Sequence, residues 1–358
     1  MNEFYKNKKV LITGHTGFKG AWLTQILLNW GAEVVGISLK PNTTPSLFEV
    51  LNQEKNIKNY FVDIRDIDAL KKFFKDEQPE IVFHLAAQAI VRTSYDDPID
   101  TISTNVMGTA NFLEATRETK SVKSAVVITT DKVYDNKEWH HAYRENDPLG
   151  GYDPYSSSKA AADIISSSYI QSFFNPKDFG GKHATLVAIT RAGNVIGGGD
   201  WAEYRLIPDI IRAVYHEGKD VIIRNPESIR PWQHVLEPLA GYLELGQGLY
   251  EGRTDLSGAW NFGPNNESFH NVKSLVEGSK EILGKGGYQI IPDISKHEAS
   301  LLKLDINKAI ALLDWAPKLN FQETLNLTFD WYKNYYDNKE DVVEFTNKQI
   351  NNFFGNIR

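Results

Sequence analysis

Short apolar runs alternate with helical stretches through the first half of the chain. The runs KVLI, IVFHLA and AVVIT are almost uninterrupted and rich in β-branched residues, which is typical of strands covered on both faces. Strands of this kind, separated by helices, predict a parallel sheet with crossover helices, a doubly wound α/β fold. The predicted strands are 9–12, 33–38, 61–62, 81–85, 125–129 and 184–189, and the predicted helices are 20–30, 66–76, 99–119 and 155–174.

The alternation loosens beyond residue 190. The sequence RAGNVIGGGDW contains a glycine cluster that marks a loop. This half of the chain predicts a second, smaller α/β region without a repeat of fixed period. Its predicted helices are 208–217, 238–250, 271–283, 306–312 and 321–336, with short strands near Val221 and Tyr288.

Composition removes several classes of function from consideration. The chain has 358 residues, and its 39 basic and 46 acidic side chains give a net charge of −7 without a run rich in Lys or Arg. Nucleic acid is therefore not an expected partner, because its phosphates need a basic surface. The absence of Cys excludes disulfides and thiolate chemistry and favours a reducing compartment, so we expect a cytoplasmic protein. No run approaches the roughly 20 apolar residues that cross a bilayer, and the N-terminus lacks the apolar core of a signal peptide, so no membrane is expected.

A glycine-rich turn follows the first predicted strand. The segment TGHTGFKG places Gly14, Gly17 and Gly20 three residues apart, between a strand and a helix. Glycines there permit a tight turn and a close backbone approach, so that a pyrophosphate can bind the free N–H groups at the start of the helix. A ligand-free tight turn could use the same residues, but the position between strand and helix favours a dinucleotide site.

Tyr155 and Lys159 are candidate catalytic groups on one predicted helix. They are four residues apart, so both side chains project from the same helical face. A tyrosine with a pKa of about 10 is a poor base at neutral pH, and a neighbouring ammonium group lowers that pKa. The pair can therefore remove a proton from a hydroxyl group, although such pairs also arise by chance on helices.

A second candidate group follows the strand 125–129. Thr130, Asp131 and Lys132 emerge at its carboxyl end, where doubly wound sheets bind ligands. Acidic and basic side chains elsewhere on a surface are usually solvated and inert. The position at a strand end makes these three candidates for a catalytic site.

Several segments together resemble a known family. The spacing T-G-x-x-G-x-x-G is similar to that of short-chain dehydrogenase/reductases, VDIRD and HLAAQ match segments that line the cofactor there, and YSSSKAAAD follows at the family's interval. The segments GHTGFKGAWL, PSLFEV, STNVMGT, RAGNVIGGGDW and RPWQHVLEP resemble the CDP-glucose 4,6-dehydratases of the extended, nucleotide-sugar branch. So does TDK, where other nucleotide-sugar 4,6-dehydratases have Thr-Asp-Glu. The resemblance covers nearly the whole chain.

This resemblance implies an NAD-dependent lyase. It implies a Rossmann-type dinucleotide-binding domain formed by 1–190 and about 228–262, and a nucleotide-sugar-binding domain formed by about 191–227 and 263–358. It implies no metal. The residues that it assigns to NAD are Gly14, His15, Thr16, Gly17, Phe18, Lys19, Gly20, Asp63, Ile64, Leu85, Ala86, Ala87, Tyr155 and Lys159.

The resemblance also implies a role for each catalytic group. Thr130 hydrogen-bonds O4 of the sugar, Tyr155 takes its proton, and Lys159 holds the nicotinamide ribose. Hydride passes from C4 to the nicotinamide and later returns to C6; in between, a base removes H5 while Asp131 protonates the departing C6 hydroxyl. Lys132 is then either this base or a cation that stabilises the enolate. The implied substrate-binding residues are Arg92, Thr130, Asn194 and Arg230.

Some alternatives remain open. The second strand leads into GISLKPN, where an acidic residue usually binds the adenine ribose of NAD, but Lys40 stands there and leaves NADP as an alternative. The alternative activities are an epimerase, a 4,6-dehydratase of another nucleotide sugar, and a non-catalytic NAD-binding relative. The intact Tyr155 and Lys159 oppose the last. The resemblance further implies deoxysugar synthesis, of the kind that supplies lipopolysaccharide O-antigen, and a homodimer or higher homo-oligomer.

Overall fold

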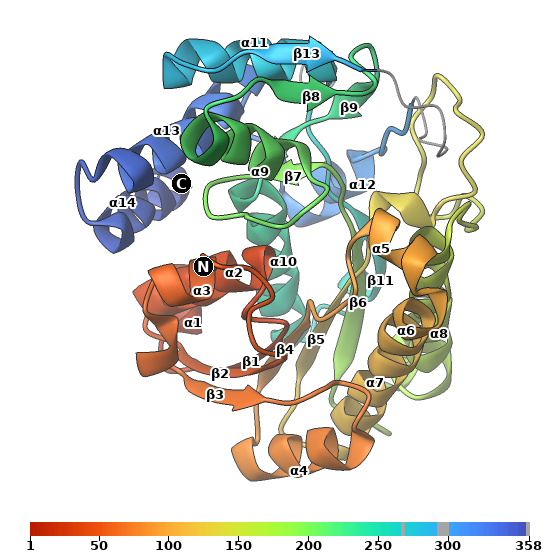
Figure 1. Cartoon of the computed structure of the whole chain (residues 1–358). Coiled ribbons are helices and arrows are strands. Elements are labelled where there is room, and N and C mark those ends of the chain that lie inside the picture. Colours follow the sequence, from red (N-terminus) through yellow and green to blue (C-terminus); the bar gives the residue numbers. More distant parts are fainter. Residues whose placement is uncertain (266–268, 292–300, 356–358) are drawn as a thin grey trace.

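The computed structural model describes residues 1–265, 269–291 and 301–355. Its centre is a parallel sheet of seven strands in the order β11-β6-β5-β4-β1-β2-β3 (Figure 1). This architecture confirms the predicted doubly wound α/β fold. The strands are β1 (Lys9–Thr13), β2 (Glu33–Ser38), β3 (Lys58–Phe61), β4 (Ile81–His84), β5 (Ser124–Ile128), β6 (Leu186–Arg191) and β11 (Gly258–Asn261).

Helices cover both faces of the sheet. Successive side chains of a strand point to opposite faces, so Val10 and Ile12 belong to one buried cluster while Leu11 belongs to the other. The continuous apolar runs of the sequence are the consequence, because each face of each strand is buried. The first face carries α2 (Phe18–Asn29) and α10 (Leu236–Tyr250), and the second carries α4 (Ile67–Glu77), α7 (Gly108–Glu118) and α8 (Pro154–Ser172).

The helix predicted over 99–119 differs from the structure in its middle. Here α6 (Pro98–Ile102) and α7 are joined by a π-helical turn over Ser103–Met107. Asn105 in this turn points inward, where its side chain hydrogen-bonds both the N–H and the C=O of Gln88 and the hydroxyl of Ser158. The segment predicted over 208–217 likewise divides into α9 (Leu206–Ile211) and a π-helical turn. Apolar spacing does not distinguish these turns from α-helix, since they depend on what the inward side chains contact.

The C-terminal half packs above the carboxyl edge of the sheet (Figure 1). Three pairs of short strands lie there: β7 (Val195–Ile196) with β10 (Gln233–His234), β8 (Val221–Ile223) with β13 (Tyr288–Ile290), and β9 (Ile229–Pro231) with β12 (Phe269–Asn271). After α9 and α10, the helices of this half are α11 (Val272–Leu283), α12 (Asn307–Leu313), α13 (Phe321–Asp337) and α14 (Val342–Gly355). In the described ranges, none of the helices is both long and apolar enough to cross a membrane.

Elements of the C-terminal half also contact the sheet and its first helical layer directly. The helix α10 and the strand β11 pack on or extend the central sheet, and both lie within 228–262. The last helix, α14, contacts α2, where Gln25 donates to Asn347 at 2.9 Å and Trp30 stacks edge-on with Phe354. The division of the chain into two domains at the expected boundaries stays a prediction.

Candidate active site

A cleft of about 1240 Å³ opens along the carboxyl edge of the sheet. One wall comes from the segments that follow β1, β2, β4, β5 and β6, and the other comes from the loops of the C-terminal half. The strand order reverses between β1 and β4, and doubly wound folds bind ligands at this switch point. If the candidate residues from the sequence form one site, their side chains should therefore meet in this cleft.

The glycine-rich turn between β1 and α2 forms the floor of the cleft. Gly14 has a φ of +78°, and a Cβ there would lie 2.6 Å from the N atom of Ala86. A Cβ at Gly20 would overlap the carbonyl of Gly14, so only glycine fits either position. Gly17 caps α2 without a side-chain hydrogen bond, and a Cβ there would meet Gly14 O at 3.4 Å. The start of α2 therefore presents backbone N–H groups to the cleft, as a pyrophosphate site requires.

Other residues assigned to the cofactor also line the cleft. The hydroxyl of Thr16 hydrogen-bonds the Ser38 hydroxyl at 2.8 Å and donates to the carbonyl of Leu39 at 3.0 Å, which fixes the turn against the end of β2. Asp63 accepts hydrogen bonds from the backbone N–H and the guanidinium of Arg65, and these hold the pKa of its carboxyl below the usual range against the effect of burial. The further lining residues from the predicted set are Phe18, Ile64, Leu85, Ala86 and Ala87.

His15 and Lys19 occupy different surroundings from each other. The ring of His15 is fully buried, packs on Phe48 and hydrogen-bonds Asn59 at 2.7 Å, so it points away from the lining of the cleft. Burial lowers its pKa to about 4. Lys19 instead lines the cleft, where burial and the charge of Arg205 lower its pKa to about 8.

Tyr155 and Lys159 lie on the first turns of α8 and face the cleft together. Lys159 is 4% exposed and donates to the carbonyl of Ile128 at 2.8 Å. Burial lowers its pKa to about 8, while the carboxylate of Asp163 acts in the opposite direction. Burial raises the pKa of Tyr155 to about 12 even though the Thr130 hydroxyl lowers it. The expected lowering of the Tyr155 pKa is thus outweighed by burial.

Thr130, Asp131 and Lys132 form a tight turn at the end of β5. Thr130 donates to Asp131 Oδ1 at 2.9 Å, and its oxygen accepts from the Lys132 N–H at 3.4 Å. Asp131 is 2% exposed, and a Cβ at Gly193 would overlap its carboxylate. The side chain of Lys132 is exposed in the cleft. The turn therefore presents one buried acid and one accessible cation beside Tyr155.

The three remaining substrate candidates also line the cleft. Asn194 has a φ of +50° and donates to Asp131 Oδ2 at 3.4 Å. The guanidinium of Arg92 lies 5.7 Å from the ring centre of Tyr204, and Arg230 lies on β9 in the other wall. The structure thus brings cations from both walls to one cavity.

Comparison with known proteins shows the family to which this chain belongs. The profile of the family described as GDP-mannose 4,6 dehydratase matches residues 11–328. The chain belongs to this dehydratase family. The CDP-glucose 4,6-dehydratase of Salmonella typhimurium is 46% identical over 351 residues, which are 98% of this chain and 97% of that protein. These matches confirm the resemblance seen in the motifs.

Solved structures of dehydratases and epimerases share the fold of this chain. A dTDP-glucose 4,6-dehydratase from Bacillus anthracis in complex with NAD is 26% identical, has a TM-score of 0.75 and covers 92% of this chain and 98% of its own. A UDP-glucose 4-epimerase from Thermus thermophilus in complex with NAD is also 26% identical, with a TM-score of 0.76 and coverages of 91% and 99%. Because dehydratases and epimerases share this fold, the choice of reaction depends on the site.

The cleft also contains a charged residue, Arg205, that the sequence analysis did not identify as a candidate. Arg205 directly precedes α9 as its N-cap and donates to Asp200 at 2.9 Å, and its positive charge acts on both Tyr155 and Lys19. Its sequence context, EYRLIPD, is typical of the polar residues that precede many helices, so it gives no sign of a functional role. Only the packing of α9 over the cleft shows that this arginine belongs to the site.

Proposed function

We propose that the protein is an NAD-dependent CDP-glucose 4,6-dehydratase, which converts CDP-D-glucose to CDP-4-keto-6-deoxy-D-glucose and water. The observation that carries this proposal is the meeting of two pairs of groups in one cleft, Tyr155 with Lys159 and Asp131 with Lys132. The first pair suits removal of a hydroxyl proton, and the second suits elimination of water. The 46% identity to the Salmonella enzyme supports both the reaction and the nucleotide.

The residues present fit a dinucleotide. The floor of the cleft has room for a pyrophosphate at Gly17, where the first turn of α2 lacks a side-chain cap. NAD, when bound, supplies a reversible acceptor for a hydride from the sugar. The residues that would hold it are Gly14, Thr16, Gly17, Phe18, Gly20, Ile64, Leu85, Ala86 and Ala87 along the floor, with Tyr155 and Lys159 beside them. For His15, Lys19 and Asp63, the expected contacts with the cofactor stay predictions.

In the oxidation step, we propose that Tyr155 accepts the proton of the sugar O4 hydroxyl. The pKa of its phenol is about 12, so positive charges must assist the transfer. Arg205 already lowers this pKa, and the ammonium of Lys159 would do so from the same helix. Thr130 orients O4 by a hydrogen bond. Loss of the O4 proton and of hydride from C4 leaves a ketone at C4.

In the elimination step, the C4 ketone acidifies the C5–H bond. We propose that Lys132 removes this proton or stabilises the resulting enolate, while Asp131 gives a proton to the departing C6 hydroxyl. The C5–H and C6–O bonds break and one water leaves. Return of the hydride to C6 and of a proton to C5 would then complete the 4-keto-6-deoxy sugar. Asn194 and Arg230, with Arg92, would bind the diphosphate and the sugar, because an Arg fork suits phosphate oxygens.

A substrate panel tests the proposal. The purified protein, supplied with NAD, is incubated with CDP-, dTDP-, GDP- and UDP-glucose, and a 4-keto-6-deoxy product is sought by NMR. We expect this product from CDP-glucose first. A 4-epimer as product, or dehydration of another nucleotide sugar in preference, would establish one of the alternative enzymes. No product from any of the four would favour a non-catalytic NAD-binding relative.

We propose NAD rather than NADP, bound less tightly than with an acidic ribose partner. Lys40 follows β2, and its Nζ lies 5.9 Å from the ring centre of Phe61. It stands where an acidic residue usually binds the adenine ribose of NAD. The missing ribose hydrogen bond should cost about 0.5–1.5 kcal/mol. Calorimetry on stripped protein and on Lys40→Asp should show tighter NAD binding by the variant. Stronger binding of NADP than of NAD by the unaltered protein would contradict the proposal.

We further propose a homodimer or higher homo-oligomer. Ile99 and Ile102 on α6, Met107 in the π-helical turn and Ile164 on α8 are exposed by 74%, 42%, 54% and 56%. Contacts between α6, its continuation and α8 bring these elements together, and a second copy would cover such an apolar face. The expected cytoplasmic location and role in deoxysugar synthesis stay predictions.

A further inference from the structure

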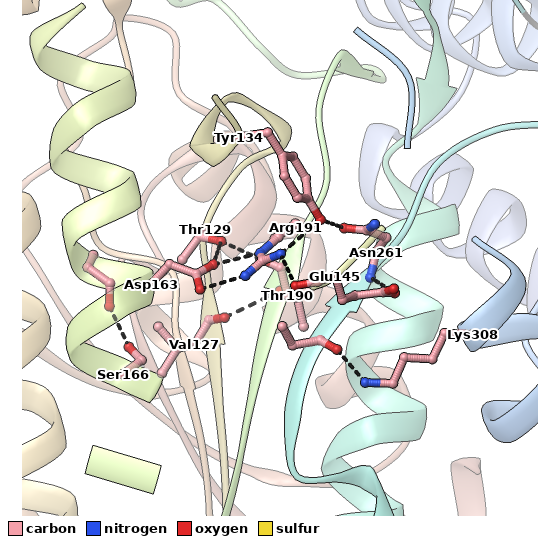
Figure 2. A network of polar contacts seen from close by, with 12 residues as sticks. Val127, Thr129, Tyr134, Glu145, Asp163, Ser166, Thr190, Arg191, Asn261 and Lys308 are labelled. Atoms are coloured by element: carbon pink, nitrogen blue, oxygen red, sulfur yellow. Dashed lines mark hydrogen bonds and ion pairs between the residues drawn. The ribbon is translucent and has the colours of Figure 1, made fainter. Parts of the chain in front are cut away.

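A buried ion pair lies beneath the candidate active site. Arg191, at the end of β6, and Asp163, on α8, have side chains that are 3% and 0% exposed. Arg191 Nε donates to Asp163 Oδ2 and Nη2 donates to Oδ1, both at 2.8 Å, so the contact is a two-point fork (Figure 2). Neither residue lines the cleft. The pair therefore acts on the site through other residues.

The remaining donors of Arg191 contact the segment that follows the acid-bearing turn. Its Nη1 donates to the hydroxyl of Tyr134 at 2.8 Å and to the carbonyl of Glu145 at 2.9 Å. The Tyr134 hydroxyl in turn donates to Asn261 Oδ1 at 2.7 Å, at the end of β11 (Figure 2). Tyr134 is 1% exposed and lies two residues after Lys132. Its hydroxyl is thus held between Arg191 and Asn261, and Tyr134 itself lines the cleft beside the turn.

Asp163 connects the same arginine to the helix of the Tyr-Lys pair. It lies four residues after Lys159 on α8, so both side chains project from one helical face. Its Oδ2 also accepts from the Thr129 hydroxyl at 3.2 Å, one residue before the acid-bearing turn. The carboxylate therefore contacts both the strand end that carries the turn and the helix that carries Tyr155.

Stability alone does not explain such a pair. Removing two charges from water costs several kcal/mol per ion, and buried pairs often contribute no more stability than apolar residues of the same volume. The planar guanidinium does fix directions, because its donors leave in a rigid fork. Here Nε and Nη2 lead to Asp163 on the helix of Tyr155 and Lys159, while Nη1 leads to Tyr134, two residues after Lys132, and to the Glu145 carbonyl.

We propose that Arg191, with Asp163 and Tyr134, is a positioning group that holds the acid-bearing turn at Asp131–Lys132 in register with the Tyr155–Lys159 helix. The inference rests on the proposed function, since it concerns a reaction in which both pairs act on one sugar. Oxidation at C4 needs Tyr155 and Lys159, while elimination at C5 and C6 also needs the turn. A displacement of ~1 Å between reacting groups can lower a rate about 10²-fold. Loosening the Tyr134 contact should therefore slow elimination more than oxidation.

Tyr134→Phe tests this without breaking the buried ion pair. The variant loses only the hydroxyl that links Arg191 to Asn261. Tyr5→Phe is the matched control, because Tyr5 is equally buried and its hydroxyl donates to the carbonyl of Leu243 on α10, outside the cleft. Thermal unfolding and calorimetric NAD binding of both variants show whether each is folded and competent to bind the cofactor.

With CDP-glucose, we expect the turnover rate of Tyr134→Phe to fall by at most about tenfold. Its steady-state reduced-cofactor absorbance should rise markedly, and its uptake of solvent deuterium at C5 should slow. Tyr5→Phe should change the unfolding temperature without raising that absorbance. If Tyr134→Phe slows all steps in proportion, or behaves as Tyr5→Phe does, Arg191 and Tyr134 are merely structural and the inference is wrong. A wild-type protein that fails to dehydrate any nucleotide sugar overturns the proposed function and the inference together.

Discussion

At the scale of single residues, the Tyr155 hydroxyl is the most exacting element of the proposed chemistry. Burial holds its pKa at about 12, so proton removal relies on neighbouring positive charge. Tyr155→Phe removes only this oxygen, and we expect folding and NAD binding to persist while turnover falls by about 10²–10⁴-fold, the usual contribution of a general base. Steady-state kinetics with calorimetric NAD binding on the same sample checks this. Near-wild-type turnover would contradict the assignment.

Lys132 is the residue that distinguishes this turn from Thr-Asp-Glu. Its side chain is exposed in the cleft, next to the buried Asp131. Lys132→Met keeps an unbranched side chain as far as Cε and removes the amine. We expect C4 oxidation to continue and elimination to stop, so that reduced-cofactor absorbance rises on addition of CDP-glucose with little product. Normal turnover with wild-type deuterium incorporation at C5 would show that another residue removes H5.

At the scale of elements, α10 is attached to the C-terminal segment by a buried carboxylate. Glu237 is 2% exposed, and its Oε1 accepts from the N–H groups of Lys318 and Leu319 at 2.8 and 2.7 Å. Burial raises its pKa from 4.5 to about 7, although these N–H groups act in the opposite direction. Between those two values the folded protein binds more protons than the unfolded chain, so this group makes the protein less stable as the pH rises.

Glu237→Gln removes this titration while keeping an oxygen for both N–H groups. We expect the unfolding free energy of the variant, relative to wild type, to increase between pH 5 and pH 8 by at most about 3 kcal/mol. Above pH 8 the difference should stay constant, which serves as the internal control. Denaturant unfolding at several pH values measures it. A difference that is the same at pH 5 and pH 8 would mean that Glu237 ionises as an exposed glutamate does.

At the scale of the whole molecule, the exposed apolar face on α6 and α8 should determine the assembly state. A stable dimer buries about 1,200–2,000 Å² of surface, and charges at its centre oppose association. We expect the double variant Ile99→Glu/Ile164→Glu to be a folded monomer under conditions where the wild type is a dimer or larger, as measured by light scattering. Leu312→Glu on α12, where Leu312 is 48% exposed, is the control and should leave the mass unchanged. A wild-type monomer would overturn the proposed assembly.

The sequence by itself determined the features that depend on local spacing. Apolar runs buried on both faces predicted the strands β1, β2, β4, β5 and β6, and the turn at Gly14 and Gly20 followed because only glycine fits there. The four-residue interval placed Tyr155 and Lys159 on one face of α8. Each of these depends on residues within a few positions of one another, and such spacing is visible in a sequence.

The tertiary structure decided whatever depends on distant segments. No predicted strand covers β11, because its four residues become a strand only by pairing with β6. His15 turns toward Asn59 while Lys19 faces the cleft, although both belong to the same turn. In the sequence, Arg191 and Arg205 are indistinguishable from other arginines. Only the folded chain places Arg191 against Asp163 and Arg205 in the cleft. The strengths of charges and hydrogen bonds in the site depend on burial, and burial exists only once the chain has folded.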